Sequence, residues 1–146
     1  MNTETVVPEG VVLVLDTNIV LDLFVYEDPA THALLRQLDA PGTRWLATDA
    51  MREELARVLA YPQIAKRLLA RALPADAVLA QFDRRADRVP AAAKAPYTCK
   101  DPDDQRFIDL AAAHQAVLLS KDAEVLCMAR RLARLGVVVQ RVWAPA

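Results

Sequence analysis

The sequence predicts an α/β fold, a three-layer α/β/α sandwich with a central, mostly parallel sheet. Short apolar runs rich in β-branched residues, such as Val11 to Leu15, alternate along the chain with segments whose apolar residues recur at helical spacing. A strand that is apolar throughout is typical of a parallel sheet whose two faces are both covered by helices. With 146 residues and 54% hydrophobic content, we expect one domain over residues 1–146 with a sizeable core.

Proline, glycine and capping residues mark where the expected elements begin and end. Pro29 and Pro74 each open a helix, because the fixed backbone angle of proline suits the first helical turn. Gly136 ends the last helix, since glycine adopts the left-handed conformation at a C-terminal cap. The expected strands are 11–15, 45–47, 117–119 and 137–139, with a further short strand near 141–143, and the expected helices are 29–41, 48–61, 64–73, 75–89, 101–114 and 122–135.

Residues 62–100 are expected to form a helical insertion within this alternation. The region reads as two helices followed by the irregular connection PAAAKAP, residues 90–96. No strand is predicted in it.

The composition excludes several classes of function. Three glycines that lie far apart cannot form a Gly-rich dinucleotide turn or a phosphate-binding loop. Ser120, the only serine, lacks the flanking glycines of a serine-hydrolase elbow, and His32 and His114 are too far apart for a helical zinc-binding pair. Cys99 and Cys127 do not have the spacing of a zinc ribbon or a redox pair, so we expect two free thiols.

Charge and hydropathy indicate the cellular compartment of the protein and the kind of nucleic-acid site it can have. The formal net charge is −1, so any nucleic-acid site has to be local rather than a general basic coat. The N-terminus is polar and acidic, and no apolar run approaches 18 residues. We therefore expect a cytoplasmic protein with no membrane association.

Carboxylates occur where open parallel sheets bind their ligands, just beyond the carboxyl ends of the strands. Asp16 follows the first strand directly, and Asp122 comes shortly after residues 117–119. Glu54 lies beside the apolar stripe of its helix, and Asp104 shares a stripe with Phe107, so both are expected to point inward. Their neighbours Glu53 and Asp103 are expected to face solvent, while Asp101 and Asp122 also suit the simpler role of helix N-caps.

Several carboxylates at one sheet edge repel one another unless a cation neutralises them. An all-oxygen ligand set without histidine favours Mg²⁺ or Mn²⁺ over zinc. Such ions activate water and stabilise the leaving oxygen of a phosphodiester, so hydrolysis of that bond is the predicted reaction.

Three segments of the chain resemble the PIN-domain family. Within that family, they are most similar to the toxin ribonucleases of toxin–antitoxin pairs, a group that resembles virulence-associated protein C. The segments are VLDTNIVLDLF from Val14 to Phe24, TDAMREELARVLAYP from Thr48 to Pro62, and DPDDQRFIDLAAAHQAVLLSKD from Asp101 to Asp122. The resemblance implies an Mg²⁺- or Mn²⁺-dependent endonuclease that cleaves single-stranded RNA and is held in check by a cognate antitoxin.

The resemblance also implies roles for individual residues. It assigns metal binding and catalysis to four acids and supporting roles to three further residues, among them Asn18, which would steady the first acid. Within the run of acids at 101–104, it leaves open which aspartate is the third ligand. The four acids are Asp16, Glu54, Asp104 and Asp122, and the supporting residues are Asn18, Ser120 and Asp101.

Basic residues of the insertion and its exit loop suggest a rim that binds RNA phosphates. The alternative is an ordinary solvated helix face. Leu68 and Leu69 are expected to be exposed and to support a homodimer. The candidate phosphate-binding residues are Arg84, Arg85, Arg88 and Lys100.

Two other functions compete with the nuclease. A catalytically inactive PIN-like interaction module would share the fold but has no need for the full set of acids. A phosphoacceptor signalling domain would use a strand-end aspartate with a hydroxyl and a lysine, which Ser120 and Lys121 match. It also needs an acidic pair near the first strand, and the sequence has none there.

Overall fold

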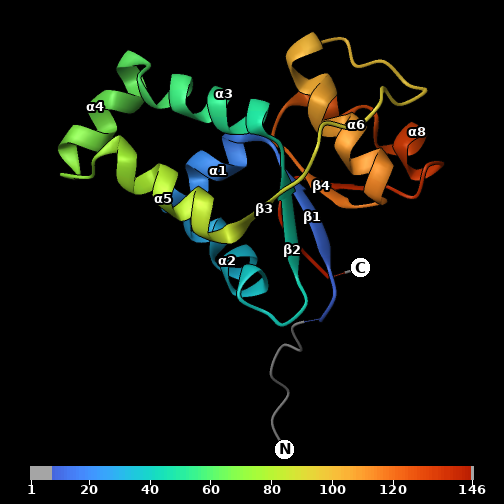
Figure 1. Cartoon of the computed structure of the whole chain (residues 1–146), viewed down its shortest axis with the longest axis horizontal. Helices are drawn as coiled ribbons and strands as arrows, with labels where there is room; N and C mark the ends of the chain where they lie inside the picture. Colours follow the sequence, from blue (N-terminus) through green and yellow to red (C-terminus); the bar gives the residue numbers. More distant parts are fainter. Residues whose placement is uncertain (1–7, 146) are drawn as a thin grey trace, which may run out of the picture.

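The computed structural model describes residues 8–145, in which five strands form one sheet (Figure 1). The spatial order is β3-β2-β1-β4-β5, and every neighbouring pair is parallel. The predicted α/β fold with a parallel central sheet is therefore confirmed. The strands are β1 (Val12–Leu15), β2 (Arg44–Ala47), β3 (Ala86–Arg88), β4 (Val117–Leu119) and β5 (Val138–Gln140).

Helices cover both faces of the sheet. In Figure 1, α1 to α5 lie on one side of the strands, and α6 and α8 lie on the other. The α-helices are α1 (Thr17–Phe24), α2 (His32–Leu38), α3 (Asp49–Leu59), α4 (Pro62–Ala70), α5 (Ala75–Arg85), α6 (Gln105–His114), α7 (Ala123–Leu126) and α8 (Ala129–Ala133), and the 3₁₀ turns are η1 (Pro29–Thr31) and η2 (Pro102–Asp104).

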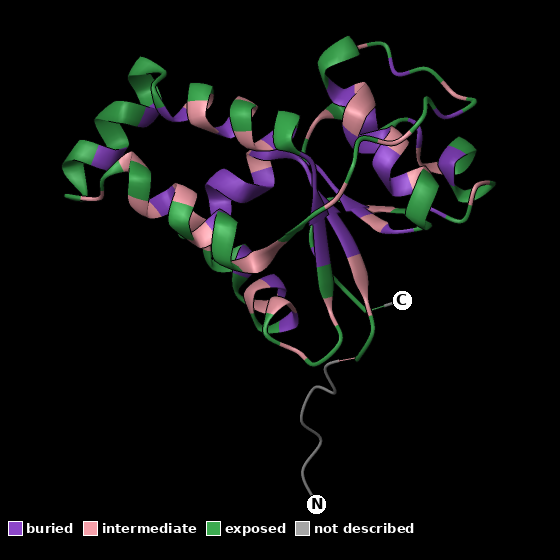
Figure 2. Cartoon of the chain, in the orientation of Figure 1, coloured by how far each residue is buried: buried purple, intermediate pink, exposed green. Residues whose placement is uncertain are grey.

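The central strand β1 is apolar because helices bury it from both sides. Leu13, Val14 and Leu15 are at most 2% exposed, and Figure 2 shows buried residues along the strands and on the helix faces turned toward them. In the same core, Trp45 of β2 packs edge-on against Phe82 of α5, with ring centroids 5.1 Å apart.

The prediction that the insertion has no strand is wrong. The expected helix 75–89 ends at Arg85, and Ala86 adopts an extended conformation that begins β3. β3 pairs with β2 in the register Trp45↔Ala86, and the Val89 N–H donates to the Ala47 carbonyl at 2.9 Å. Pairing with a distant strand therefore overrides the helical pattern of these residues.

The C-terminal region also differs from the expectation. The predicted helix 122–135 is divided into α7 and α8, because Cys127 and Met128 lie between them outside helical structure. Residues 141–143 form no strand within the described part of the chain.

The two leucines proposed for a dimer interface differ in exposure. Leu69 is 83% exposed, whereas Leu68 is 5% exposed and packs in the core, so its expected exposure is wrong. The helical spacing of α4 turns Leu68 to the same side as buried Ile64, four residues earlier. None of the helices in residues 8–145 combines the length and apolar character needed to cross a membrane.

The difference in exposure between buried and exposed leucines gives a test of the core. We expect Leu118→Ala to lower the free energy of unfolding by about 2–5 kcal/mol, because Leu118 is fully buried in β4 and its truncation leaves a cavity. Leu69→Ala is the matched control and should change that free energy by less than about 0.5 kcal/mol. Denaturant titration followed by circular dichroism measures both, and equal losses in the two variants would contradict the packing described.

Candidate metal centre

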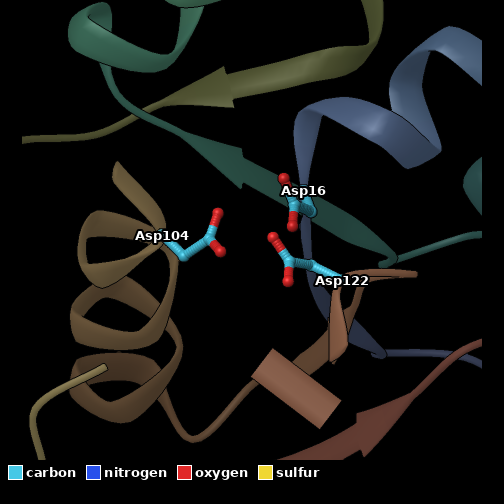
Figure 3. A group of neighbouring side chains, drawn as sticks. All are labelled: Asp16, Asp104 and Asp122. Atoms are coloured by element: carbon cyan, nitrogen blue, oxygen red, sulfur yellow. The ribbon is translucent and has the colours of Figure 1, made fainter. Parts of the chain in front are cut away.

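Three aspartates from separate parts of the sequence meet at the carboxyl end of the sheet (Figure 3). Asp16 follows β1 directly, Asp122 follows β4, and Asp104 ends the 3₁₀ turn that leads into α6. Each offers a carboxylate oxygen, and these three atoms lie within 4.8 Å of one another. The structure thus brings together three of the four predicted acids.

Ser120 fixes the relative position of two of these acids. Its hydroxyl donates to Oδ2 of Asp16 at 2.6 Å, and the backbone N–H of Asp122 donates to the same hydroxyl at 3.0 Å. Ser120 is fully buried, so water does not compete for these bonds. Its supporting role is therefore to orient Asp16 and the chain at Asp122.

The turn before α6 separates the roles of its three aspartates. Asp101 is an N-cap, because its carboxylate accepts a hydrogen bond from the Asp103 N–H at 3.0 Å. Asp103 is exposed, whereas Asp104 is 7% exposed and points toward the other two acids (Figure 3). Of the three, only Asp104 belongs to the cluster.

The surroundings of two of these carboxylates disfavour their charged forms. Burial raises the pKa of Asp104 to about 8, and hydrogen bonding with Asp122 and the charge of Asp16 act in the same direction. Burial also raises the pKa of Asp16, although hydrogen bonds from Ser120 and from the Thr17 N–H oppose the rise. Three ionised acids at this spacing need a neutralising cation.

The residues present fit a hard divalent cation. Oδ2 of Asp104 is buried and has no hydrogen-bond partner among the described residues, so it is available as a ligand. The donors of the cluster are all carboxylate oxygens, which Mg²⁺ and Mn²⁺ prefer over softer ligands.

Glu54 lies beside the cluster rather than within it. Its Oε2 accepts a hydrogen bond from the Thr17 hydroxyl, and its Oε1 lies 3.6 Å from the guanidinium of Arg106. Its negative charge nevertheless contributes to the raised pKa of Asp16. Of the four acids predicted to share one metal site, the three aspartates have carboxylate oxygens within 4.8 Å of one another, while Glu54 holds the adjoining position.

The sequence reasoning missed the two partners of Glu54. Thr17 was overlooked although it directly follows Asp16, a position that could have drawn attention to it. No feature of the sequence identifies Arg106 in the same way, because its contact with Glu54 of α3 depends on how α6 packs against α3.

Asn18 has a different role from the one expected. Its side-chain oxygen accepts a hydrogen bond from the Lys121 N–H at 3.2 Å, so it steadies the segment after β4 rather than the Asp16 carboxylate. The amide still acts at the centre, since Lys121 lies between Ser120 and Asp122.

The predicted basic residues differ in how freely they could bind phosphate. Arg85 is paired with Asp39 at 2.6 Å, and Arg88 is paired with Asp49 and Asp83 at 2.6 and 2.9 Å. Arg84 donates to the side chain of Gln81 at 2.7 Å. Lys100 is exposed and forms no ion pair within residues 8–145.

A comparison with known proteins connects this geometry to a family. The family model described as "PIN domain" matches residues 12–124, a range that includes all three clustered aspartates. No curated protein sequence matches the chain.

The raised pKa of Asp104 predicts how stability depends on pH without a divalent ion. Between its ordinary value of 3.8 and about 8, the folded chain holds a proton that the unfolded chain has released. The free energy of unfolding should therefore fall as the pH rises through this range. Thermal unfolding in EDTA from pH 4 to 8 measures the slope.

The same measurement on two variants attributes the slope to Asp104. Asp104→Asn should reduce it and leave the contribution of Asp16, whose pKa is also raised, because the amide does not titrate, whereas Asp103→Asn at the exposed neighbour should leave it unchanged. Added Mg²⁺ should raise the stability of the wild type at pH 8, since the ion binds the folded chain in preference to the unfolded one. A wild-type slope retained in Asp104→Asn would contradict the assignment.

Proposed function

Because the chain belongs to the PIN-domain family, we propose that it is an Mg²⁺- or Mn²⁺-dependent endoribonuclease that hydrolyses phosphodiester bonds of single-stranded RNA. The observation that carries the proposal is the cluster of Asp16, Asp104 and Asp122, whose carboxylate oxygens lie within 4.8 Å of one another. Membership in the family is by itself enough to support nuclease activity. The choice of RNA as the substrate rests on the resemblance of the three sequence segments to toxin ribonucleases.

The residues of the centre have separable tasks in this reaction. Asp16, Asp104 and Asp122 would hold the divalent ion, which when bound supplies the positive charge that activates water and stabilises the leaving oxygen. Ser120 orients Asp16 through its hydrogen bond at 2.6 Å. Glu54 keeps additional negative charge close to Asp16, in a position set by Thr17.

We further assign the protein to the toxins of toxin–antitoxin pairs, acting in the cytoplasm under the control of a cognate antitoxin. The resemblance to the toxin ribonucleases supports this assignment. Exposed Leu69 on α4 remains available for a homodimer contact.

The central test replaces the acid that directly follows β1. Asp16→Asn should abolish hydrolysis of a fluorescently labelled single-stranded RNA, because the amide keeps the shape of the side chain but loses the ligand charge. EDTA should abolish the activity of the wild type, and added Mg²⁺ or Mn²⁺ should restore it. Asp103→Asn, at an exposed neighbour of the cluster, is the control and should retain activity.

Two outcomes of this assay would overturn the proposal. Cleavage that persists in EDTA would indicate a mechanism without metal. RNA that stays intact with the wild type in both Mg²⁺ and Mn²⁺ would favour the inactive interaction module.

A second test concerns capture of the RNA backbone. Lys100→Glu should weaken binding of single-stranded RNA to the Asp16→Asn protein and reduce the slope of log K against log salt by about 0.7, as expected for one phosphate contact on a single strand. Lys66→Glu, on α4, is the matched control. Fluorescence anisotropy at several salt concentrations measures both, and an unchanged slope in Lys100→Glu would remove Lys100 from the proposed rim.

This test avoids the arginines of the insertion for a structural reason. Reversing Arg88 would break its ion pairs with Asp49 and Asp83 and would disturb folding and binding together.

A further inference from the structure

A cavity of about 220 Å³ lies between α1, the start of α2 and the segment that follows β5, and Leu119 and Lys121 at the end of β4 also line it. It is smaller than the roughly 300–1,000 Å³ of pockets that hold drug-sized ligands, so it suits a single ring system. Its apolar wall includes Ile19, Leu34 and Trp143. An indole in such a wall offers a flat surface against which an aromatic ligand packs.

An ion pair between a buried aspartate and an exposed lysine lies in the wall of this cavity and has no part in the proposed metal chemistry. Nζ of Lys121 lies 2.6 Å from Oδ2 of Asp22, and the Asp22 side chain is 10% exposed. A carboxylate that lines a cavity and has a second oxygen beside the one in its ion pair can accept a hydrogen bond from a donor group of a ligand.

The cavity is connected to the centre through the residues that follow β4. Lys121 lies between Ser120, which orients Asp16, and Asp122, a member of the acidic cluster. Its N–H donates to Asn18 in the first turn of α1, which fixes this segment against the helix. A ligand in the cavity therefore lies against the chain segment that carries Asp122.

The polar groups of the cavity favour one nucleobase. Asp22 and Asp28 supply carboxylate acceptors and Lys121 supplies an ammonium donor, while Arg141 adds a second positive charge to the lining. An edge that meets Asp22, Asp28 and Lys121 has two donor groups and one acceptor. Guanine has this edge in N1–H, the N2 amino group and O6, whereas cytosine and uracil each offer one donor group and two acceptors, and adenine offers one donor group and no carbonyl oxygen.

We propose that this cavity binds a guanine base of the RNA next to the bond that is cleaved, with Asp22 accepting from the base and Lys121 donating to its O6. The proposal rests on the proposed nuclease function. It makes Asp22 a residue that determines sequence specificity, and it predicts that the enzyme cuts beside guanines.

Cleavage of designed substrates tests this specificity. Four single-stranded RNAs that are identical except for one central G, A, C or U should be cut at that position at least about tenfold faster for G. Asp22→Asn should lose most of this preference, because the amide replaces an acceptor by a donor, while Asp76→Asn on exposed α5 should keep it. Equal rates for the four wild-type substrates, or an unchanged preference in Asp22→Asn, would overturn the proposal.

A binding measurement separates this proposal from the nuclease function. Trp143 lines the cavity, so guanosine monophosphate added in EDTA should change the tryptophan fluorescence saturably, and this change should be absent in Trp143→Phe. Adenosine, cytidine and uridine monophosphates should bind at least about tenfold more weakly. Failure to cleave any RNA would contradict the nuclease alone, whereas equal binding of the four nucleotides, or no binding of the guanine nucleotide, would contradict the guanine site.

Discussion

The parallel pairing of β1 with β4 is the contact on which the rest of the site depends. Its register places Leu15 beside Leu119, so the two strands end together and their next residues lie at one edge of the sheet. The Asp16 N–H donates to the Leu119 carbonyl at 2.9 Å, which extends the pairing to the first acid itself. Asp16 and Asp122, far apart in the sequence, consequently meet without any long loop having to fold over them.

The same arrangement brings together three carboxylates that repel one another when they are ionised. Packing of α6 and of the turn before it holds Asp104 against two other acids, and burial raises its pKa to about 8. A folded chain without a cation must therefore keep protons on its acids or accept repulsion between them. The cluster therefore lowers the stability of the ion-free fold, an arrangement that is common at functional sites.

The sequence was informative where a short pattern decides the outcome and uninformative where distant packing decides it. The apolar run of β1 followed by Asp16, and the stripe shared by Asp104 and Phe107, correctly predicted the sheet and the convergence of three acids. β3 was missed because its residues continue a helical pattern and become a strand only by pairing with β2. The partner of Glu54 on α6, Arg106, depends on helix packing in the same way.

The two outer strands of the sheet determine how copies of the chain avoid aggregating. β3 and β5 have three residues each, too few to template a long added strand. β3 carries charged Asp87 and Arg88, and the Gln140 side chain of β5 holds Ala144 through two hydrogen bonds. Edge-to-edge joining of sheets is therefore disfavoured, and a concentrated solution of the protein should stay free of fibrous assemblies built on these edges.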